Sequence, residues 1–320
     1  MASLDPTNLR SAQVVVAHAD CPDGIASALL LHAALPEAEV RFVEHGTPEH
    51  RDLAAVAGMV FCDIVPPAAR AAEFVAAGAV VLDHHRSARD VIAAFGPRGV
   101  FADEDDERGV SGALLAYREV WVPLLGESAP ARRFAELAGI RDCWLTEHPD
   151  WREATNQAAA LLLWGYPELA TGPGVPPSLS EAQAAAGARA VTRRADTARQ
   201  IAARELLFAT PRLAIYNDRE RSVSDVAQAA FELHPELAVV AGFYFKVTSE
   251  GRMLLVCSLR SRPLGVDVAA IAKRLGGGGH RAAAGFGREV TTDMPNPLTL
   301  LTGLLSPNLS EAGGAQPGPR

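Results

Sequence analysis

Residues 79–85 read AVVLDHH, an apolar run that ends in an acid and two histidines, Asp83-His84-His85. Apolar runs of this length that are rich in valine favour a buried strand. Polar groups at a buried strand end are costly unless they find partners. The triplet therefore requires either ordinary hydrogen bonds or a metal ion, and the rest of the chain decides between the two.

Other apolar runs also end in polar residues. QVVVAHA at 13–19 is followed by DCPDG at 20–24, and MVFCDIV at 59–65 carries an aspartate near its end. Helical patterns separate these runs, and alternating strands and helices indicate a parallel α/β sheet. Ligands collect at the carboxyl ends of the strands in such sheets. We expect the following side chains to meet at one edge: His18, Asp20, Asp23, Asp63, Asp83, His84 and His85.

Composition limits the function classes. The 320 residues carry a net charge of −8, which argues mildly against a protein that grips long duplex nucleic acid. No apolar run approaches the roughly 20 residues of a membrane span, and Met1–Arg10 lacks a signal core. We therefore expect a cytoplasmic protein without a membrane partner. The four cysteines form no CxxC pair, and we predict that Cys21, Cys62 and Cys143 are small core residues.

A Pro/Gly-rich break near 167–177 precedes an Ala-rich helical stretch with several arginines, which we interpret as a solvated connecting helix. The second half then alternates strands with two helices, which is typical of a small α+β domain. The predicted fold class is α/β, with a parallel-sheet N-terminal domain joined by a helical linker to a smaller α+β C-terminal domain. The predicted segments are an N-terminal domain at 1–166, a linker with the connecting helix at 167–210, a second domain at 211–290 and a partly disordered tail at 291–320.

Aspartates and imidazoles without a set of thiolates make a hard oxygen/nitrogen site, which suits Mn²⁺ or Mg²⁺. Two such ions about 3.5–4 Å apart share a carboxylate and activate a water for attack on phosphorus. His85 would then face the phosphoryl oxygens. One division of the ligands is the following: first ion, His18 and Asp20; second ion, Asp23, His84 and Asp142; bridge, Asp63.

Each of these residues also has an ordinary structural explanation. His18 could be hydrogen-bonded at its strand end, and Asp20 or Asp23 could cap the helix that follows. The coincidence of several strand-end clusters favours the metal site over these separate explanations.

Two features of the second half indicate a phosphate or base contact. Four glycines, Gly276–Gly279, precede His280, and glycine lets the backbone approach a ligand closely. A flexible turn is the structural alternative. Arg260 at a strand end can make a charge-assisted contact to phosphate, although an exposed arginine at such a position is also common on protein surfaces.

Together these segments resemble a known family. HADCPDG at 18–24, Asp63, Asp83-His84-His85 and Asp142 resemble the four motifs of the DHH phosphoesterase superfamily. SLRS at 258–261 and GGGGHRAAAG at 276–285 resemble the small C-terminal domain of its first subfamily, which includes nanoRNases, pAp phosphatases and RecJ-like enzymes. The resemblance extends over about residues 13–290.

The resemblance implies a two-domain hydrolase with two Mn²⁺ ions, for which Mg²⁺ or Co²⁺ could substitute. His85 would assist at the phosphate, and Asp83 would support it. The implied metal ligands are His18, Asp20, Asp23, Asp63, His84 and Asp142, and the implied substrate-binding residues are Arg260, Gly277, Gly278, Gly279, His280 and Ser111. Many family members place the first two aspartates two residues apart, whereas Asp20 and Asp23 are three apart, so the terminal ligand stays open.

Within the family, the glycine–histidine segment disfavours a type II inorganic pyrophosphatase. The compact layout favours a Mn²⁺-dependent phosphodiesterase that hydrolyses short single-stranded oligonucleotides or linear or cyclic dinucleotides. A 3′-phosphoadenosine 5′-phosphate phosphatase and a single-strand exonuclease are alternatives, and a catalytically silent nucleotide-binding module is the alternative outside enzymes. A homodimer also stays open.

Overall fold

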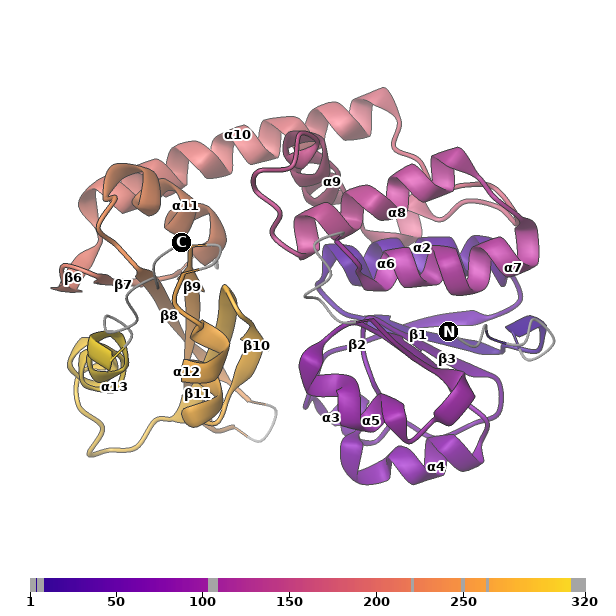
Figure 1. Cartoon of the computed structure of the whole chain (residues 1–320), viewed down its shortest axis with the longest axis horizontal. Helices are drawn as coiled ribbons and strands as arrows, with labels where there is room; N and C mark the ends of the chain where they lie inside the picture. Colours follow the sequence, from indigo (N-terminus) through magenta and orange to yellow (C-terminus); the bar gives the residue numbers. More distant parts are fainter. Residues whose placement is uncertain are drawn as a thin grey trace, which may run out of the picture. The chain divides into compact units, whose positions relative to one another are not determined.

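The computed structural model describes residue 4 and residues 9–102, 109–219, 222–248, 251–262 and 265–311. The chain divides into two compact units, Met1–Val191 and Thr192–Arg320. The division falls inside helix α10 (Glu181–Arg204) and within the segment predicted as the linker. Each unit has its own sheet and its own core (Figure 1).

A parallel sheet forms the centre of the first unit. Its five strands lie in the order β2-β1-β3-β4-β5, and every neighbouring pair is parallel. This confirms the predicted parallel α/β domain. The strands are β1 (Val14–His18), β2 (Glu39–Val43), β3 (Met59–Cys62), β4 (Val80–Asp83) and β5 (Gly99–Phe101).

Helices cover both faces of this sheet, because successive strand side chains point to opposite faces. Phe61 and Val81 pack on the side of α4 and α5, whereas Cys62 and Leu82 pack on the side of α2, α6 and α8 (Figure 1). The helices of this unit are α2 (Pro22–Ala34), α3 (Pro48–Arg51), α4 (Ala71–Ala76), α5 (Arg89–Ala93), α6 (Gly112–Ala116), α7 (Val122–Leu125), α8 (Ala129–Asp142) and α9 (Trp151–Leu169).

The second unit is a mixed sheet of six strands in the order β10-β11-β9-β8-β7-β6, with helices on both faces. This confirms the α+β prediction. Cys257 and Leu259 face the cluster formed with α12 and α13, and Tyr216 and Val240 face α11. The elements are β6 (Leu207–Thr210), β7 (Leu213–Asn217), α11 (Val223–Leu233), β8 (Val239–Val247), β9 (Met253–Ser261), α12 (Val268–Arg274), β10 (Gly278–His280), β11 (Ala283–Glu289) and α13 (Pro297–Glu311).

Helix α13 lies in the segment predicted as a partly disordered tail. Leu301, Leu305 and Leu309 recur every four residues and are buried against the second sheet. This spacing places them on one face of the helix. Residues 312–320 of the predicted tail lie outside the described residues.

None of the helices in the described part of the chain is long and apolar enough to cross a membrane.

The glycine run forms part of the second sheet. Gly278–His280 is strand β10, and it pairs with β11 in antiparallel register. Gly279 has a φ of +131°, and a Cβ at this position would lie 2.6 Å from the main-chain oxygen of Ala283. Only glycine adopts this conformation at this distance without strain. A Cβ on Gly278 would meet nothing within 4 Å. Position 279 therefore requires glycine, whereas position 278 has room for a side chain.

Replacing Gly279 with alanine should lower the free energy of unfolding by about 1–3 kcal/mol, because an L-residue is strained at this φ. Replacing Gly278 with alanine is the matched control and should change the free energy by less than about 0.5 kcal/mol. Urea denaturation of both variants measures the difference. Equal stabilities would contradict the requirement for glycine at position 279.

Candidate metal centre

The carboxyl ends of three neighbouring strands bring acids and imidazoles together. His18 is the last residue of β1, Asp63 follows β3 directly, and Asp83 ends β4 with His84 next to it. Parallel strands end at the same sheet edge, so these side chains converge. Asp63, Asp83 and His84 are fully buried, whereas His18 is half-buried.

Asp63 lies between the two histidines. Its Oδ2 is 3.5 Å from Nδ1 of His18, and its Oδ1 is 3.4 Å from Nε2 of His84. Neither carboxylate oxygen makes a hydrogen bond. Its backbone is left-handed, with a φ of +62°, which aspartate tolerates better than most residues. A buried carboxylate with one oxygen toward each imidazole has the arrangement of a ligand shared between two cations.

The charges of this group are tightly linked. Burial alone would raise the pKa of Asp63, but His18 and His84 hold this pKa well below its ordinary value. Burial would lower the pKa of His18 and of His84, but the contact with Asp63 raises both above their ordinary range. The two imidazoles therefore favour the ionised form of the buried carboxylate, and the carboxylate favours the charged form of each imidazole.

Asp142 extends the cluster from a different element. It is the last residue of α8, and its Oδ2 is 3.3 Å from Nε2 of His84. This oxygen is buried and accepts no hydrogen bond. His84 therefore lies between two carboxylates, Asp63 and Asp142, at the second predicted cation position.

The two aspartates of the DCPDG segment lie in different places. Asp23 is buried in the first turn of α2; its Oδ1 accepts a hydrogen bond from the Ala113 main chain at 3.1 Å, and its Oδ2 accepts none. Burial raises the pKa of Asp23, and the nearby carboxylates of Asp63 and Asp142 raise it further. Asp20 is exposed, with a φ of +53°, and lies outside the cluster. Asp23 lies next to Asp63, since a Cβ on Gly112 would be 2.6 Å from Cβ of Asp63 and 2.8 Å from Oδ2 of Asp23, whereas Asp20 is exposed.

Asp83 and His85 form a pair beside Asp63 and His84. One oxygen of Asp83 accepts hydrogen bonds from the main-chain nitrogens of His84 and His85, at 2.7 and 2.9 Å. The same oxygen lies 2.6 Å from Nδ1 of His85. Burial would lower the pKa of His85, but the Asp83 carboxylate outweighs burial and raises this pKa to about 9. Asp83 therefore orients the His85 ring and favours its protonated form.

Two cysteines also lie at the site, and the prediction that they are core residues is wrong. The sulfur of Cys21 lies within 4.8 Å of the ligand atoms of His18 and Asp63, and that of Cys143 lies within the same distance of His84 and Asp142. Both cysteines are half-buried. Cys62 is a core residue, as predicted.

Glu44 and His45 are neighbours of the site that the sequence prediction missed. Oε2 of Glu44 is 3.6 Å from Nε2 of His18, and the His45 ring packs edge-on against the His18 ring at 5.7 Å. Both follow β2, whose carboxyl end lies at the same sheet edge. The position of these residues after a predicted strand was the signal that could have identified them.

Ser111 belongs to the first unit. It caps α6, because its side chain accepts a hydrogen bond from the Leu114 main chain at 3.4 Å, and it is fully buried. The next residue, Gly112, has no side chain, and a Cβ there would lie 2.6 Å from Cβ of Asp63. The start of α6 therefore packs directly on the cluster of acids and imidazoles.

Of the other predicted substrate residues, Arg260, Gly278 and His280 share one face of the second sheet, Gly279 pairs with Ala284 in the row of Leu259 on the opposite face, and Gly277 precedes β10. Directly opposed residues on neighbouring strands point to the same face. Nε of Arg260 donates to the hydroxyl of Ser224 at 3.0 Å. The residues between Arg260 and His280 are small. The main chain is therefore accessible on this face, next to the Arg260 guanidinium and the His280 imidazole. Two cross-strand rows form it: Arg260–Ala283–His280 and Ser258–Gly285–Gly278.

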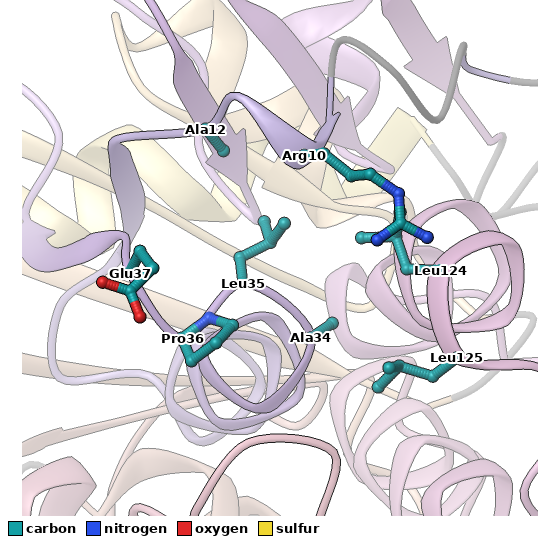
Figure 2. A pocket seen from close by; sticks show the side chains of 8 residues that line it. All are labelled: Arg10, Ala12, Ala34, Leu35, Pro36, Glu37, Leu124 and Leu125. Carbon is teal, nitrogen blue, oxygen red and sulfur yellow. The ribbon is translucent and has the colours of Figure 1, made fainter.

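A pocket of the first unit lies elsewhere. Figure 2 shows it between the end of α2 and α7, and none of the predicted site residues lines it. The lining residues are Arg10, Ala12, Ala34, Leu35, Pro36, Glu37, Leu124 and Leu125.

Comparison with known proteins shows what fold this is. No protein-family model matches the sequence, and no curated protein matches it. The chain is similar in structure to the pGpG-specific phosphodiesterase PggH from Vibrio cholerae, with 12% identity and a TM-score of 0.51 over 93% of this chain and 99% of that one. The fold is therefore that of PggH.

Two further structures match more loosely. An exopolyphosphatase-related protein from Bacteroides fragilis gives 12% identity and a TM-score of 0.42 over 96% of this chain and 93% of that one. RecJ from Thermus thermophilus, in complex with Mg²⁺, gives 15% identity and a TM-score of 0.42 over 97% of this chain and 51% of that one.

The donor set fits divalent cations, since carboxylate oxygens and imidazole nitrogens converge without hydrogen bonds on Asp63. Mn²⁺ should raise the thermal unfolding midpoint of the apoprotein. The stabilisation is expected to reach about 2.7 kcal/mol when free Mn²⁺ exceeds its Kd a hundredfold. Differential scanning fluorimetry with EDTA and with Mn²⁺ measures this shift.

Asp63→Asn should remove most of the Mn²⁺-dependent shift, because an amide is a poor shared ligand. Asp90→Asn, at an exposed position of α5, is the matched control and should keep the full shift. A shift that survives Asp63→Asn would place the cation elsewhere.

Proposed function

We propose that this protein is a divalent-metal-dependent phosphodiesterase that hydrolyses short oligonucleotides or dinucleotides, linear or cyclic. The observation that carries the proposal is Asp63, fully buried, with one oxygen toward His18, the other toward His84 and no hydrogen bond on either. A protein that only binds nucleotide has no need of a carboxylate placed between two cation positions.

The fold and the motifs support the same function. The chain has the fold of PggH, a pGpG-specific phosphodiesterase. The order of its motifs resembles the DHH phosphoesterase superfamily, and the glycine–histidine segment resembles that of its first subfamily. Mn²⁺ is our proposed cation, with Mg²⁺ or Co²⁺ as substitutes.

The proposed ligands fall into two groups around Asp63. His18 would hold one cation, and His84 would hold the other together with Asp142 and Asp23. Two bound cations would supply charge stabilisation at the phosphate and a water of lowered pKa. Water is the nucleophile, and the scissile P–O bond breaks as the new one forms.

His85 and Asp83 act on the phosphate side. Nδ1 of His85 is held by Asp83 at 2.6 Å, so the ring is fixed and its Nε2 is the atom that we assign to a phosphoryl or leaving oxygen. A protonated imidazole beside the leaving oxygen stabilises the developing negative charge and can donate the proton that the oxygen needs.

Arg260 and His280 bind a second phosphate or a base of the substrate in this proposal. They lie on one face of the second sheet, with only the methyl group of Ala283 in the row between them. A guanidinium makes bidentate contacts to phosphate, and the open main chain of Gly278 leaves room for a ligand.

A substrate panel tests the proposal. With Mn²⁺ the protein should cleave linear dinucleotides such as pGpG, and di- to pentanucleotides, to mononucleotides. Asp63→Asn should reduce kcat by about a thousandfold or more, because several kcal/mol of charge stabilisation are lost. Chromatography of the products measures both. No product with any nucleotide, and identical behaviour of Asp63→Asn, would contradict the proposal.

The same panel separates the alternatives. Preferential release of phosphate from 3′-phosphoadenosine 5′-phosphate would indicate the phosphatase, and processive degradation of long single strands would indicate the exonuclease. Arg260→Ala should raise KM more than it lowers kcat. Arg288→Ala is its control, because Arg288 is exposed and lies at an odd spacing from Ala283 along β11, on the other face.

A further inference from the structure

We infer that Cys21 is a thiolate ligand of the cation that His18 and Asp63 hold, in the place that the sequence assigned to Asp20. The inference rests on the proposed function, because it requires a cation at that position. It makes the centre asymmetric, with a sulfur donor at one cation and oxygen and nitrogen donors at the other.

The position of the sulfur is the first argument. One ligand atom each from His18, Cys21 and Asp63 lie within 4.8 Å of one another. Asp63 in this group is fully buried, and its oxygens accept no hydrogen bond. Nδ1 of His18 is also buried without a hydrogen bond. The Asp63 carboxylate, the His18 imidazole and the Cys21 sulfur thus converge on one position, where a cation would contact all three.

The backbone explains how Cys21 reaches the site. Cys21 is the N-cap residue of α2, a helix of thirteen residues, and its side chain makes no capping hydrogen bond. Cys21 lies at the N-cap but does not use its side chain to cap the helix, so its sulfur can face His18 and Asp63. Burial and the nearby Asp63 carboxylate raise the pKa of the Cys21 thiol, so the thiolate would form only when a cation binds.

Asp20 lies in the wrong place for this role. It is exposed, it adopts a left-handed φ of +53°, and it is not part of the acid and imidazole groups that converge in the described chain. The turn that precedes α2 thus directs the next residue, Cys21, to the position where the family pattern places an aspartate.

The other cysteines near the site are held by the main chain. Cys143 donates to the carbonyl of Val110 at 3.3 Å, and Cys62 donates to that of Gly112 at 3.2 Å. The thiol protons of these two residues have backbone acceptors. Cys143 is therefore the matched control for Cys21, as it lies at the second cation position but is committed to a carbonyl.

A thiolate changes which metal is preferred. Soft sulfur donors favour Zn²⁺, Co²⁺ and Fe²⁺ over Mn²⁺ and Mg²⁺, and a coordinating thiol is deprotonated when the cation binds. Removing Cys21 should weaken Zn²⁺ and Co²⁺ binding at this position by about tenfold or more, since even indirect partners of metal ligands have effects of this size.

Cobalt spectroscopy tests the inference in the full-length protein. Apoprotein loaded with Co²⁺ should show an intense near-ultraviolet thiolate-to-cobalt charge-transfer band, with the bound cobalt counted by elemental analysis. Cys21→Ser and Cys21→Asp should both lack the band, and Cys143→Ser should keep it. Cys21→Asp replaces the sulfur with a carboxylate, so cobalt should still bind at this position without the band.

The outcomes are distinct. Bound cobalt without the band in the wild-type protein, a band that survives in both Cys21 variants, or a band that is lost in Cys143→Ser each overturns the assignment and leaves the phosphodiesterase proposal standing. A wild-type protein that binds no cobalt, manganese or zinc overturns the metal centre itself.

Discussion

The burial of Asp63 between two imidazoles is the constraint on which the first unit depends. A fully buried carboxylate is stable only with opposite charge nearby, and here neither oxygen is hydrogen-bonded. His18 and His84 face this carboxylate from either side, at 3.5 and 3.4 Å, and hold its pKa low. The arrangement exists because three parallel strands end at one edge, with Asp63 in a left-handed conformation after β3. Bound cations would supply the same opposite charge to Asp63 and would also act on the phosphate of a substrate.

This constraint also explains the packing around the site. Gly112 begins α6 where a Cβ would lie 2.6 Å from that of Asp63, so the helix can sit directly on the cluster. Asp142, at the end of α8, reaches His84 from the same side of the sheet. Asp83 uses one oxygen to hold two main-chain nitrogens and the His85 ring. The polar groups of the site are thus held in place by α6, α8 and the end of β4, which pack in the core of the first unit.

The sequence predicted the fold and most of the cluster because both depend on local patterns. Apolar runs of four to five residues that end in His18, Asp63 and Asp83 fix the strands, their carboxyl ends and hence a common edge. The alternation of residues along β3 also placed Cys62 in the core correctly. Two features of the structure could not be predicted from such local patterns. Whether Asp20 or Cys21 turns toward His18 depends on the backbone of one turn, and whether 276–279 is a loop or a strand depends on its pairing with β11.

We expect Asp63 to lie between two cations when the protein is loaded with metal. Crystals grown with Mn²⁺ and measured at the manganese absorption edge test it most directly. We expect two anomalous peaks on either side of the Asp63 carboxylate, one beside His18 and one beside His84. A single peak away from Asp63, or crystals with no anomalous peak in saturating Mn²⁺, would contradict it.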